Sequence, residues 1–411
     1  MPSPTTSARR LVDVRGHNLA LVLHAVHLRG EVSRAELTAS SGLNRSTIAG
    51  LVTDLAGLGL VVDRRPSGGA KAGRPSHLVT ARDDAPFAVA VDLDVERLVV
   101  ALVGIGGTVL ARADGALPEA VGAAVAVDLV DSAVAELVAR APAGSRPGGV
   151  GVSVAGTVRR ADGLVRSAPN LGWVDVPLAA MLATSLGRRH RGLGVRVGND
   201  ADLGARAEHL RGAARDVDDV VYLSGHFGVG GGIISSGSPL PGARGFSGEF
   251  GHMAVAPGGP RCRCGGTGCF ETMVGGAALC GLAGPRYSVG REGTDRVLAD
   301  ARTGRRTAAA AVRVVAGRLG TGLATIVNVL DPRMIVVGGL LEQVLAQRSV
   351  DVEDAMCRQL GPAVRATVTV CPPGLGDDSS LLGAAELGFD ELLEATLGTP
   401  RRRRSDLVQH A

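Results

Sequence analysis

The stretch from His252 to Glu271 constrains the fold of this chain more than any other part of the sequence. One histidine and three cysteines, His252, Cys262, Cys264 and Cys269, lie within eighteen residues, and glycines separate the thiols. Glycine allows tight turns, so all four side chains can face one tetrahedral ion. One histidine with three cysteines is a complete ligand set for structural zinc and leaves no open position for catalysis. We therefore expect a Zn²⁺ ion that braces a loop.

The length and composition favour a cytoplasmic protein of two or three domains. The chain has 411 residues, more than one core usually serves, and 45% of them are hydrophobic. No apolar run in the sequence approaches the roughly 20 residues of a membrane span, and the first ten residues lack the apolar stretch of a signal peptide. In a reducing cytoplasm, clustered cysteines favour a metal over disulfides.

Positive charge is concentrated at one end of the chain. Residues 1–80 carry ten Arg or Lys against five Asp or Glu, a net charge of +5, whereas the remainder carries 34 against 35, a net charge of −1. Such an asymmetry indicates an anionic partner for the N-terminal segment, with nucleic acid as the leading candidate. A second basic run, Arg401 to Arg404, lies in residues 396–411, which we expect to form a disordered tail.

The N-terminal segment has the pattern of a helix-turn-helix. Apolar spacing predicts a first helix over residues 17–28. Ser33 with Glu36 forms a capping box at the start of a second helix, and Asn44 caps a third over residues 45–55. The third helix carries an apolar stripe at i, i+3, i+4 and i+7, formed by Ile48, Leu51, Val52 and Leu55. Helix, short glycine-containing turn and helix describe a helix-turn-helix.

A winged hairpin is expected directly after these helices. A strand over residues 60–65, a loop rich in proline and glycine, and a strand over residues 77–80 complete a winged helix-turn-helix DNA-binding domain over residues 1–82. If DNA is bound, the third helix would enter the major groove, and the basic wing would contact the backbone and minor groove. The expected DNA-binding residues are Asn44, Arg45, Ser46, Thr47, Arg64, Arg65, Lys71 and Arg74. The alternative is a small helical subdomain with an ordinary charged hairpin.

The rest of the chain predicts an α/β fold. After a linker at residues 83–86, strands are expected over residues 87–93, 97–103 and 108–111, followed by a long helix and a strand at residues 150–155. The pattern restarts at Val220, where another strand leads through glycines to a second. Two hairpins roughly 130 residues apart, each followed by helical sequence, indicate a duplicated fold with a cleft between its halves.

Several motifs resemble those of the ROK family of repressors, open reading frames and kinases. The segment Gly245-Phe-Ser-Gly-Glu-Phe-Gly-His252, followed ten positions later by Cys262-x-Cys264-Gly-Gly-x-Gly-Cys269-x-Glu271, is similar to the family signature. Segments 167–173, 197–201 and 335–340 support the resemblance. It implies a duplicated actin-like, ribonuclease-H-like domain over residues 87–395, with a sugar held between two lobes.

The polar residues of these motifs suit a sugar pocket, because carboxylates and amides pair with neighbouring hydroxyls. The expected ligand-binding residues are Asn170, Asn199, Asp200, Glu249, His252 and Glu271. The resemblance implies that His252 places one nitrogen on the metal and one on the sugar. The alternative makes Glu249 and Glu271 supports of the zinc loop alone.

The phosphate loops that a kinase needs are altered. Asp200 matches the family's catalytic aspartate, but the first strand turn reads Asp92-Leu-Asp94-Val95-Glu96-Arg97 where family kinases carry Asp-Ile-Gly-Gly-Thr-Lys. Asp94 and Glu96 would repel a polyphosphate, since one unit charge 4 Å away costs about 4 kcal/mol at an effective dielectric near 20. A second loop has bulky His226 and Phe227 before its glycines. We therefore expect no catalytic residue and no enzyme activity, and we assign Asp200 to sugar binding.

The sequence favours a DNA-binding transcriptional regulator, most simply a repressor of a carbohydrate-use operon. Its partners would be a double-stranded DNA operator, a sugar or sugar derivative as effector, and a second copy of the chain in a homodimer or a dimer of dimers. The enzyme-class alternative is an ATP-dependent sugar kinase with a DNA-binding appendage. A third hypothesis is a zinc-stabilised DNA-binding protein whose pocket has lost its ligand.

Overall fold

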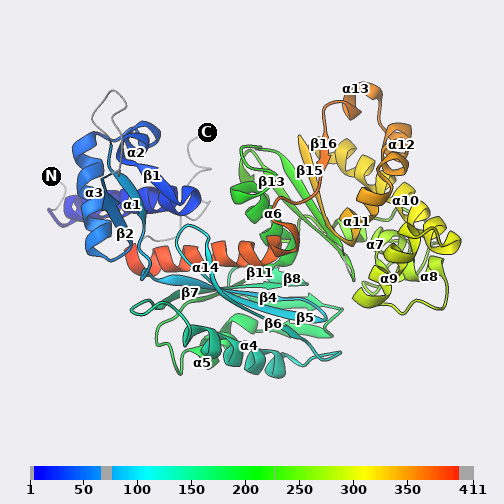
Figure 1. Cartoon of the computed structure of the whole chain (residues 1–411), viewed down its shortest axis with the longest axis horizontal. Coiled ribbons are helices and arrows are strands. Elements are labelled where there is room, and N and C mark those ends of the chain that lie inside the picture. Colours follow the sequence, from blue (N-terminus) through cyan, green and yellow to red (C-terminus); the bar gives the residue numbers. More distant parts are fainter. Residues whose placement is uncertain (1–3, 66–75, 226, 398–411) are drawn as a thin grey trace.

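A computed structural model describes residues 4–65, 76–225 and 227–397 of the chain (Figure 1). A small N-terminal unit of three helices and a three-stranded sheet precedes two larger halves, each built on a five-stranded sheet. The last helix, α14 (Ser379–Leu397), runs beneath the N-terminal unit and along the first of the two large sheets (Figure 1). The molecule is therefore a mixed α/β protein, as the sequence predicts.

The N-terminal unit contains the predicted helix-turn-helix. Its helices are α1 (Pro4–Arg29), α2 (Arg34–Ser41) and α3 (Arg45–Gly57), and its antiparallel sheet has the order β1 (Glu31–Ser33), β3 (Leu78–Ala81) and β2 (Val61–Arg64). The capping box is confirmed, because Ser33 Oγ accepts from the Glu36 amide at 3.1 Å and Glu36 Oε2 accepts from the Ser33 amide at 2.8 Å. At the turn, Gly42 has φ 69°, a left-handed conformation that favours glycine.

Two details of this unit differ from the prediction. Helix α1 begins at Pro4, thirteen residues before the predicted start, because the segment ahead of His17 has no apolar periodicity that would mark it as helical. Strand β1 was not predicted, since three residues are too short to show alternation. The apolar stripe of α3 is fully buried, as expected. The wing loop, residues 66–75, with Lys71 and Arg74, lies outside the described residues.

The two large sheets share one plan, which confirms the predicted duplication. The first has the order β11, β7, β4, β5, β6, and the second has the order β16, β15, β12, β13, β14. In each, an antiparallel hairpin, β4 with β5 or β12 with β13, has parallel strands beside its first strand. The strands of the first sheet are β4 (Phe87–Leu93), β5 (Arg97–Val103), β6 (Val109–Ala116), β7 (Pro147–Val154) and β11 (Val195–Asn199), and those of the second are β12 (Val220–Gly225), β13 (Val229–Ser235), β14 (Ser238–Pro239), β15 (Met334–Gly339) and β16 (Thr369–Cys371).

Helices cover both faces of each sheet. We call the first sheet with its outer helices lobe one and the second sheet with its outer helices lobe two. Lobe one carries α4 (Ala123–Val138), α5 (Leu178–Leu186) and a small sheet of β8 (Thr157–Arg159), β9 (Leu164–Ala168) and β10 (Trp173–Val176). Lobe two carries α7 (Glu271–Val274), α8 (Gly276–Ala283), α9 (Arg291–Arg302), α10 (Arg306–Leu330), α11 (Leu340–Gln347), α12 (Ser349–Gln359) and α13 (Pro362–Arg365).

Two helices lie between the lobes. Helix α6 (Asp200–Arg211) follows the last strand of lobe one, yet Ala201 and Ala205 pack on the sheet of lobe two. Helix α14 follows lobe two, yet Leu381, Ala384 and Ala385 pack on the sheet of lobe one. Each of these helices therefore leaves one lobe and covers the other.

Helix α10 is long and apolar enough to cross a membrane by length and composition, with a mean hydropathy of 1.4. In the structure, 61% of its most apolar window is buried inside the protein. Residues including Val312, Val315 and Leu319 pack in the core of lobe two. The same composition is typical of a buried core helix, and we interpret α10 as the core helix of lobe two.

The C-terminal end differs from the prediction in its boundary. Helix α14 continues to Leu397, two residues into the segment expected to be a tail, because its apolar residues face lobe one and the N-terminal unit. Residues 398–411, with Arg401 to Arg404, lie outside the described residues.

Candidate functional site

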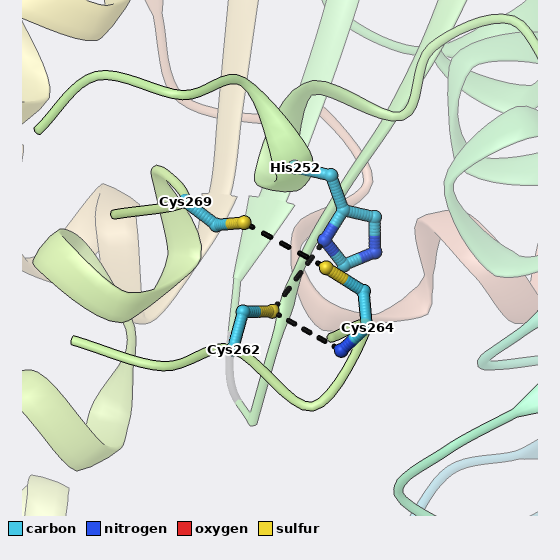
Figure 2. Close-up of side chains that lie close together, drawn as sticks. All are labelled: His252, Cys262, Cys264 and Cys269. Carbon is cyan, nitrogen blue, oxygen red and sulfur yellow. Dashed lines mark hydrogen bonds between the residues drawn. The ribbon is translucent and has the colours of Figure 1, made fainter. Parts of the chain in front are cut away.

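His252 and the three cysteines converge on one point in lobe two (Figure 2). Their ligand atoms all lie within 4.8 Å of one another, with Cys264 Sγ and Cys269 Sγ 3.7 Å apart and His252 Nδ1 3.7 Å from Cys262 Sγ. Four atoms placed tetrahedrally about 2.3 Å from an ion lie about 3.8 Å apart. The donor set and its spacing therefore fit one metal ion, as the sequence predicts.

Glycines and two short bridges shape the loop that carries the thiols. Isolated β-bridges pair Ala254 with Cys269 and Arg261 with Thr267. Gly268 has φ 67°, and a Cβ there would lie 1.7 Å from the Ala256 carbonyl oxygen. Only glycine fits at that close approach. The loop can therefore fold back on itself far enough to bring Cys269 beside Cys264.

The cluster lies beside a cleft of about 560 Å³ between the two lobes. Residues from both large sheets line it, together with the loop that carries the thiols and the starts of α9 and α14. All six predicted ligand-binding residues are among them: Asn170, Asn199, Asp200, Glu249, His252 and Glu271. The fold thus brings together side chains that are up to 101 positions apart, from Asn170 to Glu271.

Asn199 and Asp200 stand where β11 ends and α6 begins. Asn199 caps α6, because its Oδ1 accepts from the Asp202 amide at 2.9 Å. Its Nδ2 donates to the Gly156 carbonyl at 3.0 Å and to Asp200 Oδ1 at 2.9 Å. The side chain of Asn199 is therefore committed to holding Asp200 in place, and we assign it positioning of the carboxylate ahead of direct ligand contact.

The base of the cleft is strongly acidic. Burial, together with the nearby carboxylates of Asp92 and Asp94, raises the pKa of Asp200 to about 7. Burial also raises the pKa of Asp92 to about 6, although Ser153 Oγ donates to Asp92 Oδ1 at 2.7 Å and opposes the shift. A carboxyl group whose pKa is near neutral pH is present in both protonation states, so it can accept a hydrogen bond from a ligand hydroxyl or donate one to it.

The two predicted glutamates flank His252 on opposite ring nitrogens. Glu249 Oε2 lies 3.9 Å from His252 Nε2, and Glu271 Oε1 lies 3.8 Å from His252 Nδ1. Glu271 Oε1 also lies 2.7 Å from Cys262 Sγ. Glu271 therefore sits on the metal side of the ring, whereas Nε2 and Glu249 face the cleft. Across the cleft, Asn170 Oδ1 accepts from Arg263 at 2.7 Å.

At the other end of the cleft an ion pair joins the two lobes. Arg291 Nη2, at the start of α9 in lobe two, lies 3.3 Å from Asp94 Oδ2, in the turn between β4 and β5 of lobe one. The Arg291 amide also donates to Glu96 Oε2 at 3.4 Å. The turn that carries glycines in family kinases thus carries the carboxylates of Asp94 and Glu96 in this chain. Phe227 lines the cleft nearby, while His226 lies outside the described residues.

Most of the predicted DNA-binding residues that are described are exposed on the N-terminal unit. Asn44, Arg45 and Ser46 are exposed at the start of α3, Thr47 is partly buried, and Arg64 and Arg65 are exposed at the end of β2. Asn44 Oδ1 accepts from the Thr47 amide at 2.8 Å and from Ser46 Oγ at 2.7 Å, so the amide of Asn44 has only its Nδ2 donors to offer a base.

The chain matches the ROK family over residues 88–391. It belongs to the ROK family. A xylose repressor of Bacillus subtilis is 26% identical over 389 residues, which cover 93% of this chain and 97% of that protein. The resemblance to the ROK family noted in the sequence is therefore confirmed.

Two solved ROK structures are also similar. A ROK transcriptional regulator, described as a homologue of the Escherichia coli Mlc protein, has a TM-score of 0.76 at 24% identity and is covered over 98% of its length by 94% of this chain. A ROK glucokinase of Streptomyces griseus, in complex with glucose and AMPPNP, has a TM-score of 0.64 at 31% identity, over 99% of its length and 74% of this chain. This chain thus shares the two-lobed actin-like fold of ROK proteins.

Sequence reasoning missed several residues of the cleft. Arg97, Arg263, Arg291 and Ser380 line it, and none of them was among the predicted ligand-binding residues. Arg291 carried no local signal, because an arginine at a helix start ordinarily points to solvent. Arg263 was the one that could have been found, since it lies between two metal ligands.

Proposed function

We propose that this protein is a sugar-responsive transcriptional repressor that acts in the cytoplasm as a homodimer or a dimer of dimers. One observation carries the proposal: a helix-turn-helix with intact caps is joined to a ROK cleft. Xylose repressors that match the chain nearly end to end support it. The double-stranded DNA operator would meet α3, and the effector would be a sugar or sugar derivative.

The sugar would bind at the metal end of the cleft. Asp200 and Glu249 would accept from its hydroxyls, and Asn170 and the Nε2 face of His252 would complete the ring of partners. The metal would be Zn²⁺ held by His252, Cys262, Cys264 and Cys269, and it would supply a fixed orientation for His252. Sugar bound between the lobes would favour a closed arrangement and so shift the population of DNA-binding conformations.

The enzyme-class alternative, an ATP-dependent sugar kinase, has one observation in its favour. The pKa of Asp200, raised to about 7 by burial, suits a general base. Against it stand Asp94 and Glu96, whose charges would repel a triphosphate and which already bond to Arg291. We therefore propose that the protein is no kinase.

Two measurements test the proposal. Thermal unfolding in the presence of a panel of pentoses, hexoses and N-acetyl amino sugars should reveal a sugar that raises the melting temperature, because a ligand of the native state stabilises it by mass action. Selection from a random duplex pool should then yield a DNA sequence whose binding that sugar alters. Phosphorylation of a sugar from the panel by the wild type with ATP, lost in Asp200→Asn, would instead establish the kinase.

The role of the recognition helix can be tested separately. Arg45→Ala should weaken binding to the selected duplex and reduce the salt dependence of binding by about one phosphate contact. Sugar binding should be unchanged in this variant. An unaltered affinity for DNA would exclude the start of α3 as the DNA-contacting surface.

A further inference from the structure

A buried polar cluster joins the N-terminal unit to the ROK domain. His27, near the end of α1, is 2% exposed, and Glu386, on α14, is 1% exposed. His27 Nε2 lies 3.1 Å from Glu386 Oε1, and Arg211 Nε, at the end of α6, donates to the same oxygen at 2.6 Å. Burying a charge is costly unless it is paired and hydrogen-bonded, so this cluster holds its three elements in one defined arrangement.

The hydrogen bonds fix the chemical state of the cluster. The Gly106 amide can only donate, and it lies 3.1 Å from His27 Nδ1, so the ring proton is on Nε2 and is donated to Glu386. Although burial opposes it, bonding to His27 and the charge of Arg211 lower the pKa of Glu386 to about 2. Glu386 is therefore an anion paired with Arg211, and His27 is a neutral bridge.

The turn between β5 and β6 completes the cluster. Its glycines serve contacts within the protein, and we do not interpret them as a phosphate loop. Arg211 Nη1 donates to the Gly106 carbonyl at 3.3 Å, and Arg211 Nη2 donates to the His27 carbonyl at 3.1 Å. A Cβ on Gly107 would lie 2.7 Å from Arg211 Nη1, so this position must be small. Ile105, 6% exposed, packs in the core of the N-terminal unit.

Apolar contacts surround the polar ones. The ring of His27 stacks on Phe389 of α14, with centroids 3.5 Å apart and planes at 8°. Phe389 and Leu392 belong to the same core as Val22, Leu23 and Val26 of α1. The N-terminal unit is thus docked on α14 by a shared core, with the polar cluster at its edge.

Both helices that reach this cluster start at the cleft. Helix α6 begins with Asp200 and carries Arg211 eleven residues later, about 16 Å along its axis. Helix α14 carries Ser380, which donates to the Asp200 carbonyl at 3.1 Å, and then Glu386 about 9 Å further on. On α6, between Asp200 and Arg211, Arg206 forms two hydrogen bonds to Asp390 of α14, at 2.7 and 2.8 Å, so the helices are tied to each other as well.

From this geometry we propose that the cluster of His27, Arg211 and Glu386 is the joint through which the cleft controls the position of the DNA-binding unit. Because α6 covers lobe two and α14 covers lobe one, a change in the angle between the lobes strains the bond between Arg211 and Glu386. His27 bonds to both residues, so α1 must either move with them or lose its bonds to them. The inference rests on the proposed function, since it concerns how the sugar signal reaches the operator.

The test measures thermodynamic coupling in the full chain. The probes are the duplex that the wild type selects from a random pool and the sugar that most raises its melting temperature. In Arg211→Met, the factor by which sugar changes duplex affinity should fall to under twofold, from the roughly 5- to 150-fold typical of allosteric pairs. Sugar affinity and metal content should stay within about threefold of the wild type, since Arg211 touches neither site.

Two further variants make the result specific. Arg211→Lys keeps the charge beside Glu386 but lacks the planar guanidinium that bonds to three partners, so it should also lower the coupling factor. Because the charge is kept, this variant should fold, and it replaces Arg211→Met in the test if Arg211→Met unfolds. Arg140→Met is the matched control, because within the described residues the exposed Arg140 pairs with Glu136 of α4 and lies outside the cluster. Its coupling factor should equal that of the wild type.

Each outcome is decisive. Wild-type coupling in both Arg211 variants would overturn the joint and leave the proposed function standing. A wild type that selects no duplex, or that gains stability from no sugar, would overturn the proposed function and this inference with it. Equal loss in Arg140→Met would mean that the effect is unspecific, and it too would overturn the joint.

Discussion

The two ends of the cleft have been built by opposite means. At the metal end, glycines fold a loop so tightly that three thiols and an imidazole meet, and the polar side chains around them remain open to a ligand. At the other end, the turn that carries glycines in family kinases holds Asp94 and Glu96, whose carboxylates bond to Arg291 of the protein itself. One end is organised to receive a molecule, and the other is closed by the chain's own charges. A kinase would need both ends open.

The largest effect should follow from breaking the metal end. Cys264→Ser removes one of four ligands, and because metal binding and loop folding are coupled, the variant should lose the ion and several kcal/mol of stability. Metal content by mass spectrometry and thermal unfolding would measure it. Cys357→Ser is the control, since Cys357 is exposed and far from the cluster in sequence. Unchanged metal content in Cys264→Ser would contradict the assignment.

Asp200→Asn should weaken sugar binding and leave DNA binding intact. The substitution keeps the shape of the side chain but replaces an acceptor with an amide that cannot accept as a carboxylate does, so sugar affinity should fall roughly 10- to 100-fold, about 1.4 to 2.7 kcal/mol. Calorimetric titration with the sugar found in the thermal screen would check this. Loss of duplex binding in the same variant would show that the two functions are not separated as proposed.

The acidic base of the cleft should make stability depend on pH. The pKa values of Asp92 and Asp200 are raised to about 6 and 7, so between about pH 4 and pH 7 the folded state binds more protons than the unfolded state. The stability contributed by these groups is therefore fully present below about pH 4 and is lost progressively as the pH rises to about 7. The melting temperature of the ligand-free protein should fall by a few degrees over this range from this cause.

Asp200→Asn is also the control for that pH dependence. An amide cannot titrate, and removing the charge of Asp200 relieves its repulsion with Asp92, so the slope of melting temperature against pH between 5 and 8 should be shallower in the variant. Equal slopes in the two proteins would show that Asp200 is ionised throughout this range.

The smallest effect is expected at the closed end. Asp94→Ala removes a partly buried ion pair between the lobes and should cost about 0.5 to 1 kcal/mol of stability. It should not create an ATP site, because Glu96 still bonds to the start of α9. Thermal unfolding with and without ATP measures both expectations. Stabilisation of Asp94→Ala by ATP would mean that a single carboxylate closes this end.

Local chemistry explains what could be predicted from the sequence. The caps at Ser33 and Asn44 act over three residues, and the metal ligands lie within one loop, so their patterns are complete in the local sequence. The order of strands was predictable only as a repeat, because pairing depends on contacts between distant segments. Arg291 meets Asp94 across 197 positions, and His27 meets Glu386 across 359. No periodicity or spacing marks such partners.

The docking role of one glycine-rich turn could not be predicted from the sequence. The turn from Gly104 to Gly107 looks like any hairpin turn in the sequence, and nothing in it indicates that the N-terminal unit docks there. Its meaning comes from Arg211, whose guanidinium would clash with any Cβ on Gly107. The role of Asn199 could not be predicted from the sequence either. An asparagine that caps a helix and an asparagine that contacts a ligand are the same residue type.

The shared core around Phe389 and Leu392 has a consequence for biosynthesis. These side chains complete the core of the N-terminal unit, yet about 310 residues separate them from the end of β3. At roughly 5 to 20 residues per second, the ribosome delivers them about 15 to 60 s after the helix-turn-helix has emerged. Until then the nascent protein exposes an incomplete apolar surface on its first folded unit. Helix α14, translated long after β3, therefore completes the core of the N-terminal unit, and chaperone contact should concentrate in that interval.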